Sequence, residues 1–124
     1  FDGAHNAGGA EVLARYLQTL AVRDVRWVVG LKGDKRIDDI LVPLRPHCTA
    51  LYCTTAPVDA PCAPAALAKA AGGLPATVFA APTAALEAAL ADRPPDGIVL
   101  VAGSLFLVGA LRHYLSTGRP RALA

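Results

Sequence analysis

The sequence predicts an α/β fold in which a mostly parallel, twisted sheet is covered by helices on both faces. Short apolar segments typical of buried strands alternate with segments of helical periodicity, and turn-forming residues separate them. Such alternation indicates βαβ units with right-handed crossovers, which build parallel sheets. The chain has 124 residues, of which 54% are hydrophobic and 18% are charged, so it suits one well-packed domain.

The first half of the chain contains two expected helices and one strand between them. Apolar residues recur at helical spacing through residues 9–20, with polar residues on the opposite side. Residues 26–31 form a short apolar run that ends at the turn-forming residues 32–35, which indicates a buried strand. Helical spacing returns over residues 37–44, where prolines limit its extent.

The middle of the chain continues the alternation. Residues 50–54 are expected to form a second strand, followed by a loop rich in proline and alanine at 55–64. A short helix is expected at 65–71, where two glycines close it. Residues 76–80 then read as a third strand, and residues 83–91 as a helix.

The last two elements are a strand at 98–102 and a helix at 105–115. Because this helix is apolar on nearly every side through Val108, we expect it to be buried. The polar turn at residues 2–6 is of a kind normally reached from an ordered element, so we expect the first strand of the sheet upstream of residue 1. Residues 1–124 would then be one domain of a larger enzyme.

Composition argues against several classes of partner. The net charge of +2 and the scattered basic residues, except for a small cluster within 112–121, do not indicate nucleic acid binding. The longest apolar run, residues 98–111, is shorter than the roughly 20 residues that cross a bilayer, and no secretory signal precedes it. We therefore expect neither nucleic acid nor membrane as a partner.

The three cysteines, Cys48, Cys53 and Cys62, cannot all pair within one chain. Their spacing matches no zinc template, although His47 lies beside Cys48. We expect no metal site, with Cys53 in a strand and the other two in loops of a reduced, cytoplasmic protein.

Two polar clusters are expected at the carboxyl ends of strands, where ligands collect in parallel sheets. Asp2 to Asn6 follow the presumed upstream strand, and Gly103-Ser104 follow the strand at 98–102. Although about a hundred residues separate them in the sequence, both belong to the same rim of the sheet. They could share a ligand.

Each candidate side chain has both a structural and a functional interpretation. Ser104 can cap the last helix, and the same helix start can bind a carboxylate of a substrate. His5 can be an ordinary loop histidine, or can donate to an anion while Asp2 fixes its tautomer or holds an amine. Asn6 can simply cap the first helix.

Three motifs together resemble the carboxyl-terminal domain of the folylpolyglutamate synthase and dihydrofolate synthase family. They are DGAHN at residues 2–6, VVG at 28–30 leading into Asp34-Lys35, and GSLFLVG at 103–109. The order and spacing fit across nearly the whole chain. The related Mur peptidoglycan ligases share this Rossmann-like domain architecture.

The resemblance implies an ATP-dependent ligase that adds L-glutamate to dihydropteroate or folate through an acyl phosphate. In that family an amino-terminal ATPase domain, absent from this chain, holds the P-loop, Mg²⁺ and the folate. By position, Asp2 and His5 match catalytic residues, and His5 and Ser104 match residues associated with glutamate. Asp2 and Asn6 match the motif near ATP.

Some positions depart from the family pattern. Ala7 stands where proline is common, Arg36 where an acidic residue is common, and Phe106 where tyrosine is frequent. No G-x-x-x-x-G-K-[ST] motif occurs, so we expect this polypeptide to bind no ATP or Mg²⁺ by itself and to be inactive alone. Two alternatives stay open: a domain of a Mur-type ligase of peptidoglycan precursors, and a non-catalytic α/β binding module.

Overall fold

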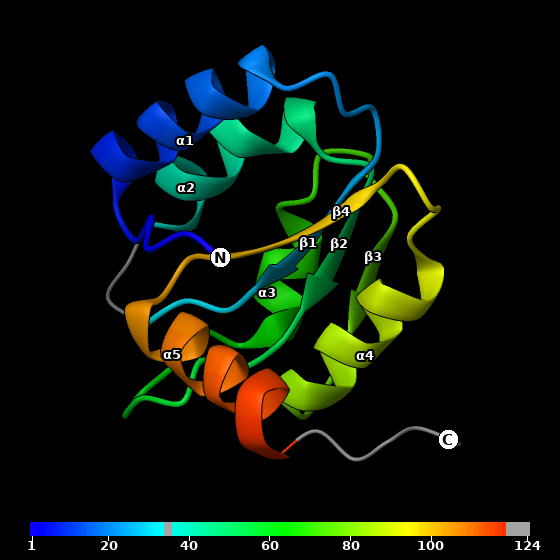
Figure 1. The fold of residues 1–124 in the computed structure, drawn as a ribbon. Helices are drawn as coiled ribbons and strands as arrows, with labels where there is room; N and C mark the ends of the chain where they lie inside the picture. Colours follow the sequence, from blue (N-terminus) through cyan, green and yellow to red (C-terminus); the bar gives the residue numbers. More distant parts are fainter. Residues whose placement is uncertain (34–35, 119–124) are drawn as a thin grey trace.

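The computed structural model describes residues 1–33 and 36–118. Four strands form one sheet in the order β3-β2-β1-β4, and every neighbouring pair in it is parallel (Figure 1). The strands are β1 (Val25–Val29), β2 (Ala50–Cys53), β3 (Ala76–Val78) and β4 (Ile98–Ala102). The helices are α1 (Ala7–Thr19), α2 (Ile37–Leu44), α3 (Pro64–Lys69), α4 (Pro82–Asp92) and α5 (Leu105–His113). The predicted α/β class and parallel sheet are confirmed.

Helices cover both faces of the sheet, as predicted, because residues along each strand alternate between two hydrophobic cores. Trp27 and Val29 of β1 face one core together with α1, α2 and α3, whereas Val28 faces the other with α4 and α5. Figure 1 shows α1 and α2 side by side over one face, with α4 and α5 on the opposite side. The carboxyl ends of the strands therefore lie between two helical layers.

Several element ends differ from the prediction. α1 begins at Ala7, two residues early, because the side chain of Asn6 caps it by accepting from the Gly9 amide at 2.8 Å. β1 ends at Val29 and not at residue 31, and β3 ends at Val78 and not at residue 80. β3 is an edge strand with an exposed outer end, so fewer sheet contacts extend it.

The start of α5 differs most from the expectation. The helix was predicted to be buried through Val108, but Leu105 is 55% exposed and Phe106 is 66% exposed. Only Leu107, Val108 and Leu111 of this helix enter the second core. The exposed residues lie on the side of the first turn that faces away from the second core, whereas Leu107 and Val108 of the same turn face it.

Some predicted features lie outside the described residues, and others can be compared with the structure. Asp34-Lys35 of the expected turn, and Arg119 and Arg121 of the basic cluster, lie outside the described residues. Cys53 lies on β2, and Cys48 and Cys62 lie in loops, as predicted; all three are buried, and none forms a disulfide bond within the described residues. Among the described helices, none combines the length and apolar character that a membrane span requires.

Thr54, which follows β2, gives a prediction about stability. It is fully buried, and its hydroxyl has no hydrogen-bond partner among the described residues. Thr54→Val removes the buried hydroxyl and keeps the shape, so we expect the free energy of unfolding in urea to rise by about 1 kcal/mol. The matched control is Thr49→Val, because the Thr49 hydroxyl accepts from the Val25 amide at 3.2 Å. This control should lose about 1 kcal/mol; a loss in both variants would contradict the prediction.

Candidate functional site

The amino-terminal segment lies beside the end of β4. The Asp2 amide donates to the Val101 carbonyl at 3.0 Å, and the backbone of Gly3 lies so close to α5 that an added Cβ would be 2.7 Å from Leu105 Cδ2. Figure 1 shows the start of the chain running next to this strand end. Two motifs at opposite ends of the sequence thus meet at one rim of the sheet.

Ser104 caps α5. Its hydroxyl accepts from the Leu107 amide at 3.3 Å, and its carbonyl accepts from the Val108 amide at 3.0 Å. By helix geometry, the N–H groups of Leu105 and Phe106 have no intrahelical acceptor, so this end of the helix favours an anion. Ser104 is therefore a helix cap, as one interpretation of the sequence predicted. This role is compatible with the binding of a carboxylate at the same helix start.

Gly103 makes the sharp bend between β4 and Ser104. Its φ is +124°, and a Cβ at this position would lie 2.9 Å from the Gly30 carbonyl oxygen. L-residues with side chains rarely adopt such a φ, and the carbonyl leaves no room for one. This bend directs the first turn of α5 toward the amino-terminal segment.

His5 projects from that segment with a defined tautomer. Its Nδ1 lies 2.8 Å from the Gly3 carbonyl oxygen, and because a carbonyl can only accept, Nδ1 carries the proton. Nε2 remains to contact a ligand. His5 and Ser104 both line one cavity of about 240 Å³, whose other lining residues are Lys32, Val58, Gly103, Leu105 and Phe106.

Asp2 and Asn6 occupy different surroundings. The Asp2 carboxylate accepts from the Ala4 amide at 2.8 Å, and Asn6 caps α1. Neither is among the lining residues of the cavity. The expectation that Asp2 fixes the His5 tautomer is not met among the described contacts, because the Gly3 carbonyl does so instead.

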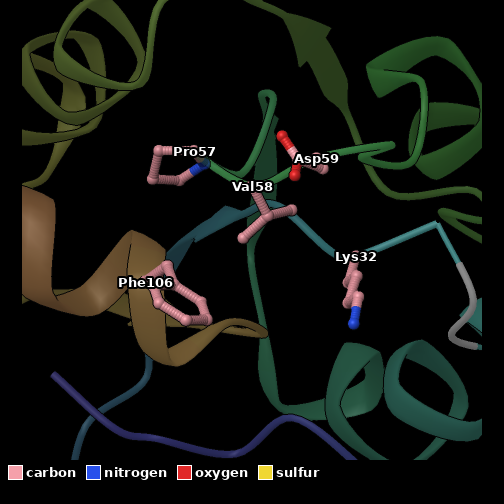
Figure 2. A pocket seen from close by; sticks show the side chains of 5 residues that line it. All are labelled: Lys32, Pro57, Val58, Asp59 and Phe106. Carbon is pink, nitrogen blue, oxygen red and sulfur yellow. The ribbon is translucent and has the colours of Figure 1, made fainter.

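The sequence did not predict that Lys32 and Val58 line this cavity. Both also border a neighbouring, more open hollow of about 590 Å³ with Pro57, Asp59 and Phe106 (Figure 2). Figure 2 shows Val58 between the Phe106 ring and Lys32. The sequence placed Lys32 in a turn and Val58 in a loop. Because each of these segments follows a parallel strand, both could have been predicted to lie at the same rim of the sheet.

The thiols of Cys48 and Cys53 do not provide a reactive group. Burial raises the pKa of Cys48 to about 12 and that of Cys53 to about 11, so both are neutral thiols near pH 7. Metal binding requires the thiolate form. Within the described ranges, no group of three or more His, Cys, Asp or Glu side chains is arranged to hold a metal ion.

Comparison with known proteins places this geometry in a family. The family model described as "Mur ligase, glutamate ligase domain" matches residues 1–105. None of the curated protein sequences matches the chain significantly.

Among solved structures, the chain is similar to E. coli FolC in complex with DHPP and ADP, with 28% identity and a TM-score of 0.88 over 97% of this chain and 29% of that one. It is similar to Mycobacterium tuberculosis folylpolyglutamate synthase complexed with ADP, with 27% identity and a TM-score of 0.83 over 97% and 30%. It is also similar to a bifunctional folylpolyglutamate synthase/dihydrofolate synthase with Mn, AMPPNP and L-glutamate bound, with 26% identity and a TM-score of 0.80 over 94% and 28%.

The chain thus spans less than a third of the length of these enzymes. Within that span, the family model extends from the DGAHN segment to Leu105, the first residue of α5. It includes the DGAHN motif and the first three residues of the GSLFLVG motif, Gly103 to Leu105. The chain therefore belongs to the Mur ligase family, as a glutamate ligase domain.

Proposed function

We propose that this domain binds L-glutamate within an ATP-dependent ligase that adds glutamate to dihydropteroate or folate. The observation that carries the proposal is the cavity shared by His5 and Ser104 at the start of α5, in a chain that matches the glutamate ligase domain. The folate side of the proposal is supported by the similarity to folylpolyglutamate and dihydrofolate synthases.

His5 and Ser104 hold glutamate by one of its carboxylates. That carboxylate takes the amides at the start of α5 and the Ser104 hydroxyl, and the Nε2 side of His5 faces the same space. Fixing glutamate in this way lets its amine attack as though the reaction were unimolecular, an effect worth up to about 7–11 kcal/mol in ideal systems. Positioning the nucleophile is therefore the main contribution of this domain.

ATP and Mg²⁺ belong to the remainder of the enzyme in this proposal. They supply the activation of the acceptor carboxylate, and this sequence has no P-loop to hold them. Asp2 and Asn6 lie on the same segment as His5, so they can face the nucleotide when an ATPase domain closes over the rim. A role of Asp2 as proton acceptor for the amine would shift the pH–rate profile of an Asp2→Asn variant.

The test uses the intact enzyme that contains this domain. We expect ADP release to require both L-glutamate and dihydropteroate or folate. His5→Ala should raise KM for glutamate by roughly 30-fold, the equivalent of about 2 kcal/mol for a hydrogen bond to a charged group, with a smaller effect on KM for ATP.

His47→Ala is the matched control, because His47 precedes β2 at the opposite end of the sheet. It should leave KM for glutamate unchanged. Release of ADP only with UDP-muramoyl substrates would replace the proposal by the Mur-type alternative, and no ADP release with any acceptor would favour a binding module. The three cysteines are buried and form no disulfide bond within the described part of the chain, which suits a reducing compartment, so we propose that the enzyme is cytoplasmic.

A further inference from the structure

The larger hollow beside the candidate site is apolar on one side and charged on the other. It has a volume of about 590 Å³ and is lined by Lys32, Pro57, Val58, Asp59 and Phe106. Figure 2 shows the rings of Pro57 and Phe106 on one side of Val58 and the two charged side chains on the other. The apolar side therefore offers a surface to an uncharged part of a ligand.

Phe106 is the only aromatic residue among the described residues that line this hollow. Its side chain is 66% exposed, whereas Leu107 and Val108 of the same turn face the second core. The turn is held in place by Ser104, whose hydroxyl and carbonyl accept from the Leu107 and Val108 amides. An exposed ring in a fixed position is a surface on which a second aromatic ring can stack.

The loop after β2 forms another wall of the hollow, through Val58. Backbone hydrogen bonds tie this loop to the turn after β1. The Gly33 amide donates to the Ala60 carbonyl at 2.8 Å. The Cys62 amide donates to the Leu31 carbonyl, also at 2.8 Å. The hollow therefore has a formed wall before a ligand binds, which lowers the entropy cost of binding.

The larger hollow adjoins the smaller cavity that contains His5 and Ser104, because Val58 and Phe106 line both. In the proposed reaction the amine of the amino acid must come within about 3–3.5 Å of the acceptor carbonyl carbon. With the amino acid in the smaller cavity of about 240 Å³, the part of the acceptor next to its carboxylate lies over the shared wall. The larger hollow, at about 590 Å³, is within the roughly 300–1,000 Å³ of typical ligand pockets.

The two acceptors of the proposed function differ at this place. In dihydropteroate the reacting carboxylate is attached directly to a benzene ring, whereas in folate it ends an aliphatic glutamyl chain. A benzene ring next to the carboxylate would lie where Phe106 is exposed. Stacking of one aromatic pair is worth roughly twofold to tenfold in affinity, and an aliphatic chain has no aromatic face to contribute.

We propose that Phe106 is the stacking surface for the benzene ring of dihydropteroate and favours this acceptor over folate. The inference rests on the proposed function. It adds a contact with the acceptor to a domain whose proposed role is to bind the amino acid. The rest of the acceptor extends beyond the rim of the sheet, toward the ATPase domain of the intact enzyme.

The experiment measures KM and kcat for dihydropteroate and for folate in the intact enzyme, at saturating ATP and L-glutamate. Phe106→Leu keeps an apolar side chain but removes the ring. We expect KM for dihydropteroate to rise roughly fivefold to tenfold, with kcat nearly constant and KM for folate changed by less than about twofold. Where folate turns over too slowly, its Ki against dihydropteroate takes the place of KM.

Two further variants sharpen the result. Phe106→Tyr keeps the ring and should retain the wild-type KM for dihydropteroate. Tyr16→Leu removes an exposed aromatic ring from α1 that lines neither the cavity nor the hollow, and it should change neither KM. Because Phe106 is exposed, Phe106→Leu should keep the wild-type melting temperature.

The outcomes separate the two proposals. Three results would overturn the role of Phe106 and leave the proposed function intact: an unchanged KM for dihydropteroate in Phe106→Leu, an equal rise in KM for both acceptors, or a wild-type enzyme that uses folate but not dihydropteroate. ADP release by the wild-type enzyme without need of glutamate would overturn the proposed function itself, and the inference with it.

Discussion

Gly103→Ala should destabilise the protein by roughly 2–4 kcal/mol, because alanine must adopt a φ of +124° and its Cβ would press on the Gly30 carbonyl oxygen at 2.9 Å. The bend cannot relax without moving Ser104, so we also expect glutamate binding to weaken. The free energy of unfolding, from urea titration followed by circular dichroism, measures the first effect.

The matched control is Gly109→Ala in the same region. Gly109 lies inside α5, and a Cβ there would meet nothing within 4 Å. Alanine favours helix over glycine, so this variant should gain about 0.5–1 kcal/mol. Equal stability changes for the two substitutions would show that the bend at Gly103 tolerates a side chain.

Trp27→Ala is expected to have an effect of similar or greater size, about 3–5 kcal/mol. Trp27 is the largest fully buried side chain, and its Nε1–H donates to the Ala102 carbonyl at 3.1 Å. Trp27→Phe retains much of the packing but removes the donor, and we expect it to lose about 1–3 kcal/mol. Urea denaturation followed by far-UV circular dichroism measures both, since fluorescence is lost with the single tryptophan.

The difference between these two variants separates packing from hydrogen bonding. Tyr16→Ala serves as the control, since Tyr16 is exposed on the outer side of α1 and should change stability by less than about 0.5 kcal/mol. If Trp27→Phe were as stable as the wild type, the bond to Ala102 would have no role in holding the end of β4. Ala102 directly precedes Gly103, so this bond also supports the site.

The sequence predicted the type of β1–β4 and α1–α5 and their order along the chain, because its periodicities are strong and turn residues separate the elements. It did not predict the order of the strands within the sheet. The DGAHN and GSLFLVG motifs could be placed at one rim because parallel strands share a carboxyl edge. The helix caps formed by Asn6 and Ser104 could also be predicted, because each side chain accepts a hydrogen bond from an amide in the first turn of the helix that follows it.

Other features depend on contacts that sequence patterns do not contain. Phe106 lies on the outer side of the first turn of α5, and because its neighbours in the sequence are apolar too, the helical periodicity does not show which side is exposed. The place of Lys32 depends on a loop in which an alanine, Ala60, adopts a positive φ. Loop conformations of this kind are decided by tertiary hydrogen bonds, here those between residues 31–33 and 60–62.

The hydrogen bond between the Asp2 amide and the Val101 carbonyl has a consequence for how the protein folds. It joins residues at almost opposite ends of the sequence, and the parallel pairing of β1 with β4 also closes a long loop. Contacts of such high sequence separation form slowly, because the entropy of loop closure must be overcome before the contact stabilises anything. His5 and Ser104 can meet only after these closures, so we expect the cavity that they line to form late, and a chain still emerging from the ribosome cannot have it until α5 has been made.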